Sequence, residues 1–132
     1  MIGTLDEKQC YDLLGSTTVG RIGFVRDARV EIIPVNYALS GRDLILHTAP
    51  DGILRSLADE GAAVAFEVDH HTDLAGSGWS VLLQATLALA TPAEKSAARV
   101  QVSPWAGADR DVALRLAVSE VSGRRVRRDP RD

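Results

Sequence analysis

The sequence predicts a mainly β, α+β fold, in which a small antiparallel β-barrel carries a few short flanking helices. About six or seven β-rich runs follow one another closely, with turn signals rather than long helices between them. A parallel sheet would instead need a crossover of about a dozen residues or more between neighbouring strands. The chain has 132 residues, which is enough for one compact domain with its own core and too few for two.

The first predicted element is a helix over residues 5–14. Thr4 and Glu7 have the spacing of a capping box, and apolar side chains then recur at helical intervals as far as Gly15. A meander of three strands follows, because β-rich runs alternate there with turn-forming residues. Its strands cover 19–25, 30–39 and 44–48, and its turns cover 26–29 and 40–43.

The next helix is expected over residues 51–60, where Ile53, Leu54 and Leu57 share one face and Gly61 follows. The rest of the pattern predicts strands and one more short helix, separated by polar loops. These elements are a strand over 62–68, a loop over 69–78, a strand over 79–90, a helix over 93–100, and final strands over 113–118 and 121–126.

Composition and charge exclude several classes of protein. With 45% hydrophobic and 25% charged residues, the chain is globular rather than disordered. No apolar run approaches the ~18 to 20 residues that span a bilayer, so we expect no membrane partner and a cytoplasmic location. Cys10 is the only cysteine, which excludes an internal disulfide and a cysteine-ligated zinc cluster.

The C-terminal residues are basic, although the whole chain has a net charge of -3. Five arginines lie within the last nine residues, but Asp129 and Asp132 are interleaved with them. Such a mixed segment favours a solvated terminus over a contact with a phosphate backbone. We therefore expect one domain over residues 1–126, a disordered basic tail over 127–132, and no nucleic-acid partner.

The first candidate site lies where a predicted strand ends just before a predicted helix, at His47 and Thr48. The first N–H groups of a helix lack partners, so a hydroxyl and an imidazole beside them suit an anion such as a phosphate. The alternative is that Thr48 only caps the helix and His47 is a half-exposed strand residue. The residues by themselves leave both interpretations open.

A second candidate is Pro34, which stands inside an apparent strand. Proline cannot donate to a strand ladder, so its position favours a sheet edge or a bulge. The backbone at Val35 and Asn36 would then be able to meet a ligand. The alternative is an edge strand that its proline protects against aggregation.

Two further groups of residues are site candidates. His70 and His71 follow Asp69, but adjacent residues of an extended segment point to opposite faces, so we predict a solvated loop and no metal site. Trp79 and Trp105 each follow a breaking residue. A tryptophan in that position is either a stacking surface for a planar ring or an anchor in the core or an interface.

Seven short motifs occur in order along the chain. They are Cys10-Tyr11-Asp12-Leu13-Leu14, Val19-Gly20-Arg21-Ile22-Gly23, Pro34-Val35-Asn36-Tyr37, Ala65-Phe66-Glu67-Val68-Asp69, Gly78-Trp79-Ser80-Val81, Pro104-Trp105 and Ser122-Gly123-Arg124-Arg125. Each is weak alone, but as an ordered set they resemble the pyridoxamine 5'-phosphate oxidase-like family of flavin split-barrel proteins. The resemblance covers nearly the whole chain and implies a split β-barrel.

The same resemblance implies a homodimer with two FMN-type sites at the subunit interface. It predicts Asn36 and Ser80 as polar contacts to the flavin ring, Thr48 with His47 as phosphate ligands, and Trp105 of the partner subunit as a ring-packing residue. The full set of cofactor-binding residues that it predicts is Val35, Asn36, Tyr37, His47, Thr48, Ile53, Ser80 and Trp105. No catalytic acid or base is predicted.

The chain departs from the family pattern at the phosphate end. Family members often carry an arginine where this chain has His47 and a lysine where it has Ile53, and commonly Arg-Gly where it has Gln84 and Ala85. Each missing cation removes a charge-assisted hydrogen bond worth roughly 1.5 to 3 kcal/mol. We therefore expect weaker phosphate affinity than in relatives that carry both cations, by about two orders of magnitude or more.

Two functions from different classes follow. The first is an FMN-binding or related flavin-binding oxidoreductase that acts on an unidentified small molecule. Arg21 or Arg55 would replace the missing cations if its side chain reaches the site. The second is a non-enzymatic split-barrel binding protein that has lost tight FMN and is empty or holds a deazaflavin or a tetrapyrrole. The colour of the purified protein separates them, because bound flavin is yellow.

Overall fold

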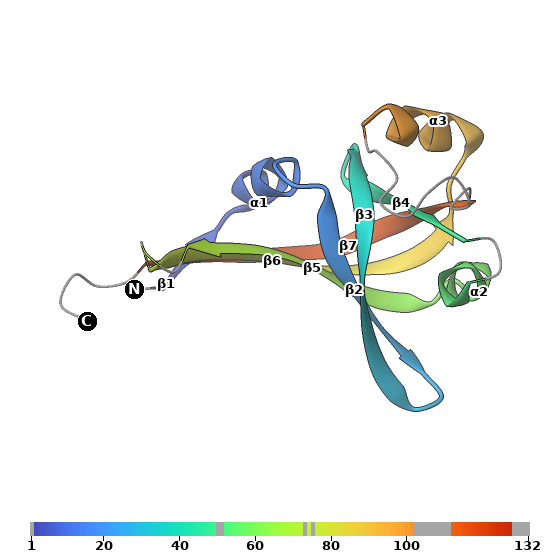
Figure 1. The fold of residues 1–132 in the computed structure, drawn as a ribbon, viewed down its shortest axis with the longest axis horizontal. Helices are drawn as coiled ribbons and strands as arrows, with labels where there is room; N and C mark the ends of the chain where they lie inside the picture. The colour runs from blue at the N-terminus through green and yellow to red at the C-terminus, as the bar shows by residue number, and fades with distance from the viewer. Residues whose placement is uncertain (1, 50–51, 73, 75, 102–111, 128–132) are drawn as a thin grey trace.

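The architecture in this computed structural model is a ring of antiparallel strands with three short helices on its outside (Figure 1). The structure describes residues 2–49, 52–72, 74, 76–101 and 112–127. The elements in chain order are β1 (Ile2–Leu5), α1 (Glu7–Leu14), β2 (Val19–Arg26), β3 (Arg29–Ser40), β4 (Asp43–Thr48), α2 (Ile53–Glu60), β5 (Ala63–Thr72), β6 (Ser77–Leu89), α3 (Pro92–Gln101) and β7 (Val112–Arg127).

Six of the strands close on themselves. Their order is β7-β4-β3-β2-β5-β6, and β6 pairs back onto β7, while β1 adds to the free edge of β7. Every pairing is antiparallel. The predicted fold class, a mainly β antiparallel barrel with short flanking helices, is confirmed.

The last strand is shared by the barrel and by an extension beside it. Residues 112–116 of β7 pair with β4, while its later residues pair with β1 on the same edge. The ends of β5 and β6 accompany β7, so four strands project from the barrel as an arm (Figure 1), defined here as residues 2–5, 69–72, 77–80 and 123–127. The arm lies outside the closed ring and is continuous with it through β5, β6 and β7.

The sequence predicted two final strands where the structure has one. Gln84 pairs with Glu120 and Ala85 with Val118, so Ser119 is an extra residue that forms a β-bulge. The polar pair at 119 and 120 resembles a turn in the sequence, but the bulge absorbs it without ending the strand. The prediction of separate strands over 113–118 and 121–126 is therefore wrong.

The barrel interior is filled by side chains that alternate inward along the strands. Phe66 is fully buried, and Tyr37, which is 1% exposed, meets its ring edge-on with a centroid separation of 5.3 Å. The Tyr37 hydroxyl donates to the Leu14 carbonyl oxygen and accepts from Thr17 Oγ1, each at 2.5 Å. A small barrel packed in this way leaves no room inside for a large ligand.

The first helix begins later than predicted. Thr4 and Leu5 belong to β1, and the capping box is formed by Asp6 and Gln9 instead. The Asp6 carboxylate accepts from the Gln9 N–H at 2.8 Å, and Gln9 Oε1 accepts from the Asp6 N–H at 2.9 Å. The predicted Thr4–Glu7 box is wrong because pairing with β7 holds Thr4 in a strand.

The second half of the chain contains one further correction. Residues 69–72 continue β5 and pair with 77–80 of β6, so His70 and His71 lie in a strand rather than in the predicted loop. The predicted helices after residues 52 and 91 are confirmed as α2 and α3. The predicted boundary at residue 126 falls near the end of β7, and residues 128–132 of the predicted tail lie outside the described residues.

Candidate functional site

Pro34 lies at an exposed edge of β3. The Tyr37 N–H donates to the Thr18 carbonyl oxygen at 2.9 Å, and hydrogen-bonded pairs alternate along antiparallel strands, so the Pro34 nitrogen faces away from β2. On that other side, β4 pairs only with residues 37–40 of β3. The register with β2 runs unbroken past Pro34, which selects the predicted sheet edge over the predicted bulge.

The three predicted ring contacts on β3 do not face the same way. Val35 and Tyr37 point into the barrel and are 4% and 1% exposed, so only their backbone is available to a ligand outside. Asn36 lies on the outer face, half-buried, and its amide Nδ2 donates to the Thr18 carbonyl oxygen at 3.3 Å. Of this segment, Asn36 alone presents a side chain to the outside of the barrel.

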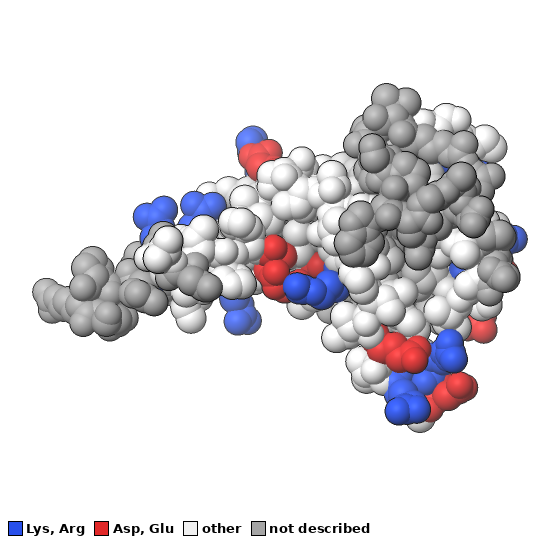
Figure 2. Space-filling view, viewed as in Figure 1, with Lys and Arg blue, Asp and Glu red and all other residues white. Residues whose placement is uncertain are grey.

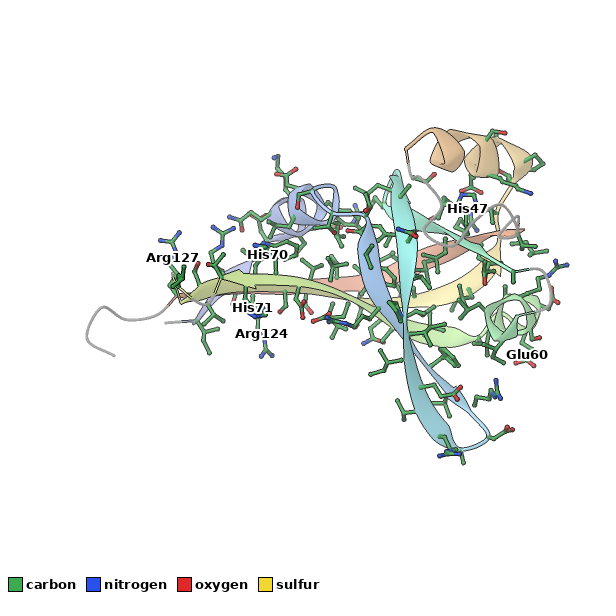
Figure 3. All side chains as sticks on the ribbon, in the orientation of Figure 1. His47, Glu60, His70, His71, Arg124 and Arg127 are labelled. Carbon is green, nitrogen blue, oxygen red and sulfur yellow. The ribbon has the colours of Figure 1, made fainter. Side chains whose placement is uncertain are left out.

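The side chains of the two predicted phosphate ligands, His47 and Thr48, point to opposite faces of β4. Thr48 is 5% exposed and continues the inward row of Leu44 and Leu46. His47 shares the outer face with Ile45, below α3, which contacts β3 and β4 (Figure 3). A single phosphate at the strand end can be reached from Thr48 on its inner side, whereas His47 approaches from the other face.

The N-terminus of α2 stands next to Thr48. Gly52 is its N-cap residue and, among the described residues, no side chain caps the helix, so the proposed alternative that Thr48 acts only as a cap is wrong. The position of a Cβ on Gly52 would lie 3.7 Å from Thr48 Oγ1. Uncapped N–H groups beside a hydroxyl make a donor set that suits an anion, while half-buried Ile53 adds no charge.

The two arginines considered as replacements for the missing cations already pair with carboxylates. Arg55 Nε lies 3.3 Å from Asp59 Oδ1 on the next turn of α2. Arg21 Nη1 bridges Glu67 Oε1 at 3.1 Å and Asp69 Oδ2 at 3.2 Å on the outer face of β2 and β5.

The outer-face cluster of Arg21, Glu67 and Asp69 holds a proton near neutral pH. Desolvation, followed by the hydrogen bond to Asp69 and its charge, raises the pKa of Glu67 to about 7. The hydrogen bond from Glu67 is the main cause that lowers the pKa of Asp69, with further lowering from Arg21. This cluster was not predicted from the sequence, although residues 67 and 69 of a strand necessarily share a face.

Ser80 joins the same outer face. It pairs with Asp69 on β5 and with Arg124 on β7, so all three side chains project to one side. Asn36 reaches this face from β3, because it pairs with Val19 two residues from Arg21. The structure therefore brings the two predicted polar ring contacts, Asn36 and Ser80, to one surface across β2 and β5.

Three further predictions do not concern this surface: the role of Trp105, the lack of a metal site and the lack of a membrane partner. Trp105 lies outside the described residues. Among the residues that the structure describes, no group of three or more His, Cys, Asp and Glu side chains is placed to hold a metal ion. No helix within the described part of the chain is both long and apolar enough to cross a membrane.

Comparison with known proteins decides the family. A sequence model of the family described as pyridoxamine 5'-phosphate oxidase matches residues 6–125. The chain belongs to this family. The uncharacterized protein Rv0080 of Mycobacterium tuberculosis is 32% identical over 133 residues, covering 96% of this chain and 87% of the relative.

Solved structures agree with the fold assignment. The FAD binding protein from Mycobacterium smegmatis is 26% identical, with a TM-score of 0.75, covering 96% of this chain and 100% of that one. A FAD-binding protein from Mesorhizobium loti has a TM-score of 0.82 at 22% identity, covering 96% of this chain and 99% of that one. The second likeness shows the shared split-barrel fold.

Proposed function

We propose that the protein is a flavin-binding oxidoreductase that acts on a small molecule, and that it works as a homodimer with an FMN-type cofactor between the subunits. The observation that carries this proposal is membership of the pyridoxamine 5'-phosphate oxidase family across residues 6–125. The FAD binding of the Mycobacterium smegmatis relative supports it. Fold alone does not fix a substrate, so the substrate is described only as a small molecule.

The filled barrel interior supports a ring site on the outside. Asn36 and Ser80 offer an amide and a hydroxyl on one outer surface, where a ring could lie across β2 and β5. Apolar side chains around this surface are exposed in the single chain: Val19 by 37%, Leu82 by 41% and Ile32 by 65%. A second subunit would remove them from water and would close the site.

The residues at the predicted phosphate site supply the hydrogen-bond donors that a flavin phosphate needs, but not the expected positive charges. Thr48 and the uncapped first turn of α2 supply neutral donors. The expected cations are replaced by His47, which lies on the other face of β4, and by Ile53. This combination supports binding of a flavin phosphate with reduced affinity.

The bound flavin would supply the electron transfer, and the chain's own residues would bind and orient it. Asn36 and Ser80 would fix the plane of the ring through hydrogen bonds. Glu67, whose pKa is raised to about 7, holds a proton on the same surface.

The test is a titration of the purified full-length chain with FMN and with FAD, in which binding is measured by the quenching of flavin fluorescence. We expect saturable binding and, by light scattering, a mass of twice the 14.1 kDa chain. A colourless protein that ignores both flavins would overturn the cofactor assignment. A monomer at micromolar concentration would remove the interface site.

A second function is favoured by one observation, namely that Arg21 and Arg55 are both engaged by carboxylates. If neither arginine reaches the phosphate, the chain would act as a non-enzymatic binding protein for another ligand, such as a deazaflavin or a tetrapyrrole. The same titration, repeated with a deazaflavin and with heme, distinguishes the two functions.

A further inference from the structure

The outward side chains of four neighbouring strands form one surface, the outer sheet face, defined here as residues 19, 21, 23 and 25 of β2, 30, 32, 34 and 36 of β3, 65, 67 and 69 of β5, and 80, 82 and 84 of β6. Gly23 pairs with Ile32 on β3 and with Ala65 on β5, so small and apolar residues cross the middle of this face. Val25 and Val30 form the next pair toward the hairpin turn and are 63% and 76% exposed. The single chain therefore leaves a broad apolar surface in water.

The described helices leave the β2 and β5 part of this face open. The main contacts of α1 and α2 are with β6 and β7, and those of α3 are with β3, β4 and β7. The β2–β3 hairpin has its charges at its tip, where Arg26 Nε lies 3.9 Å from Asp27 Oδ2 and 4.0 Å from Glu31 Oε2. Figure 2 shows positive and negative side chains together at that tip, with an uncharged surface above them. The charged residues of the outer sheet face itself are those of one cluster, formed by Arg21, Glu67 and Asp69.

This cluster stands between uncharged neighbours. Arg21 is paired with Pro34 on β3 and with Glu67 on β5, and Glu67 is paired with Leu82 on β6. One Arg21 nitrogen, Nη1, contacts both carboxylates, and Glu67 and Asp69 also hydrogen-bond to each other. The side chains of Arg21, Glu67 and Asp69 are 55%, 33% and 38% exposed, so water solvates them in the single chain. A partner that covers the apolar residues of this face must also remove water from the cluster.

The charge of the cluster depends on one proton. With all three groups ionised, one arginine and two carboxylates carry a net charge of -1, and one proton shared by the carboxylates brings the net charge to zero. Desolvation, followed by the hydrogen bond to Asp69 and its charge, raises the pKa of Glu67 to about 7, so the neutral cluster predominates at mildly acidic pH. The other titratable groups on this side are His71, next to Asp69 on β5, and Glu120 and Arg124 on β7, which β6 separates from the cluster.

A second copy of the chain is the partner that suits this face. Two copies related by a two-fold axis present the same residues to each other, so apolar side chains of one copy meet apolar side chains of the other. Burial of an unbalanced charge is costly and two like-charged faces repel, whereas neutral clusters can be covered. We propose that the outer sheet face is the contact between two copies of the chain, and that this contact closes only when Glu67 and Asp69 hold one proton between them. The contact rests on the homodimer of the proposed function and specifies its surface and its proton.

The two-fold arrangement sets the size of the pH effect. Each dimer buries two clusters, so association must take up the protons that are missing from both. Because the pKa of Glu67 is raised, its proton is present at pH 6 and is lost as the pH rises through about 7. Between pH 6 and 8 the protonated fraction of each subunit falls about tenfold, so the dissociation constant of the dimer should rise about a hundredfold.

The test is sedimentation equilibrium of the purified full-length chain at pH 6, 7 and 8, without added flavin. The native chain should show the hundredfold rise in its dissociation constant. Glu67→Gln and Asp69→Asn each leave one carboxylate to balance Arg21, so both variants should dimerise at pH 8 about as tightly as the native chain does at pH 6. The matched control is Glu120→Gln, which removes the same charge from β7 and should keep the full pH dependence.

A further variant locates the contact. Ile32 is 65% exposed, so Ile32→Glu should leave the unfolding free energy in urea nearly unchanged. It places a charge in the apolar middle of the outer sheet face and should weaken the dimer at pH 6 by about tenfold or more.

The outcomes separate the homodimer from its proton. A monomer at all three pH values would remove both the homodimer of the proposed function and the contact described here. A dimer with the same dissociation constant at pH 6 and pH 8 would overturn the proton requirement and leave the homodimer in place. A pH dependence that survives in Glu67→Gln, or that is lost in Glu120→Gln, would also overturn it. An unchanged dimer in Ile32→Glu would place the contact on another face.

Discussion

Replacing Gly20 by alanine should destabilise the barrel through a single clash. The new Cβ would lie 2.4 Å from Phe66 Cζ and 2.6 Å from Cε1, whereas carbon atoms pack at about 3.5 to 4.0 Å. Phe66 is fully buried against Tyr37, so its ring has little room to move. Overpacking of about 1 Å in such a core costs typically 1 to 3 kcal/mol, and we expect about 3 kcal/mol here.

The chain provides a matched control on the same strand. A Cβ added to Gly23 would meet nothing closer than 3.9 Å, so Gly23→Ala should be nearly neutral. Phe66→Leu removes the two ring atoms that the Gly20 Cβ would strike. Combined with Gly20→Ala, it should recover more than about 1 kcal/mol relative to the sum of the single changes.

Urea unfolding at one fixed protein concentration measures all four variants, so that any subunit association is held constant. The reasoning is refuted if Gly20→Ala and Gly23→Ala cost the same, or if Phe66→Leu adds to the cost of Gly20→Ala without recovery. Either result would mean that the interior is not packed as described around Phe66.

Three further predictions concern charge and hydrogen bonding. The pKa of Glu67 is raised from 4.5 to about 7, so its contribution to stability is fully present below about pH 4.5 and is lost as the pH rises through about 7. Glu67→Gln should therefore make the unfolding free energy depend less on pH between pH 5 and 8. Asp69, whose pKa is lowered, does not titrate in that range. Ile53→Lys should raise the affinity for FMN by about tenfold. His47→Arg should raise this affinity less, because the side chain at position 47 lies on the other face of β4. Equal gains in affinity in a fluorescence titration would contradict this order. Tyr37→Phe should cost about 1 to 3 kcal/mol by urea unfolding, since the Leu14 carbonyl oxygen and Thr17 hydroxyl lose a partner; a neutral change would mean that water replaces it.

Most of the fold could be predicted because its signals are local. Alternating apolar residues and turn-forming residues gave the meander from β2 to β4, and Gly61 marked the end of α2. The errors arose where tertiary pairing decided the outcome. Thr4 joins a strand because β7 lies beside it, and Ser119 is absorbed as a bulge because both neighbouring segments pair with β6.

The candidate site could be predicted less completely. The opposite orientations of His47 and Thr48 follow from adjacency in a strand and were available in the sequence. The surface that Asn36 and Ser80 share was not available, because it depends on the pairing of residues 65–67 of β5 with residues 21–23 of β2, which are far apart in the sequence. The ion cluster around Arg21 required the same non-local pairing.

The long β7 strand also determines how the chain can fold. Three strands, β1, β4 and β6, form hydrogen bonds with β7 in the folded chain. Of the described elements, β7 is synthesised last. Until it emerges, a nascent chain exposes three unpaired strand edges, which are sites of association with other chains. Closure of the barrel is therefore a late event in synthesis, and substitutions that slow β7 pairing should lower soluble yield before they lower the stability of the folded protein.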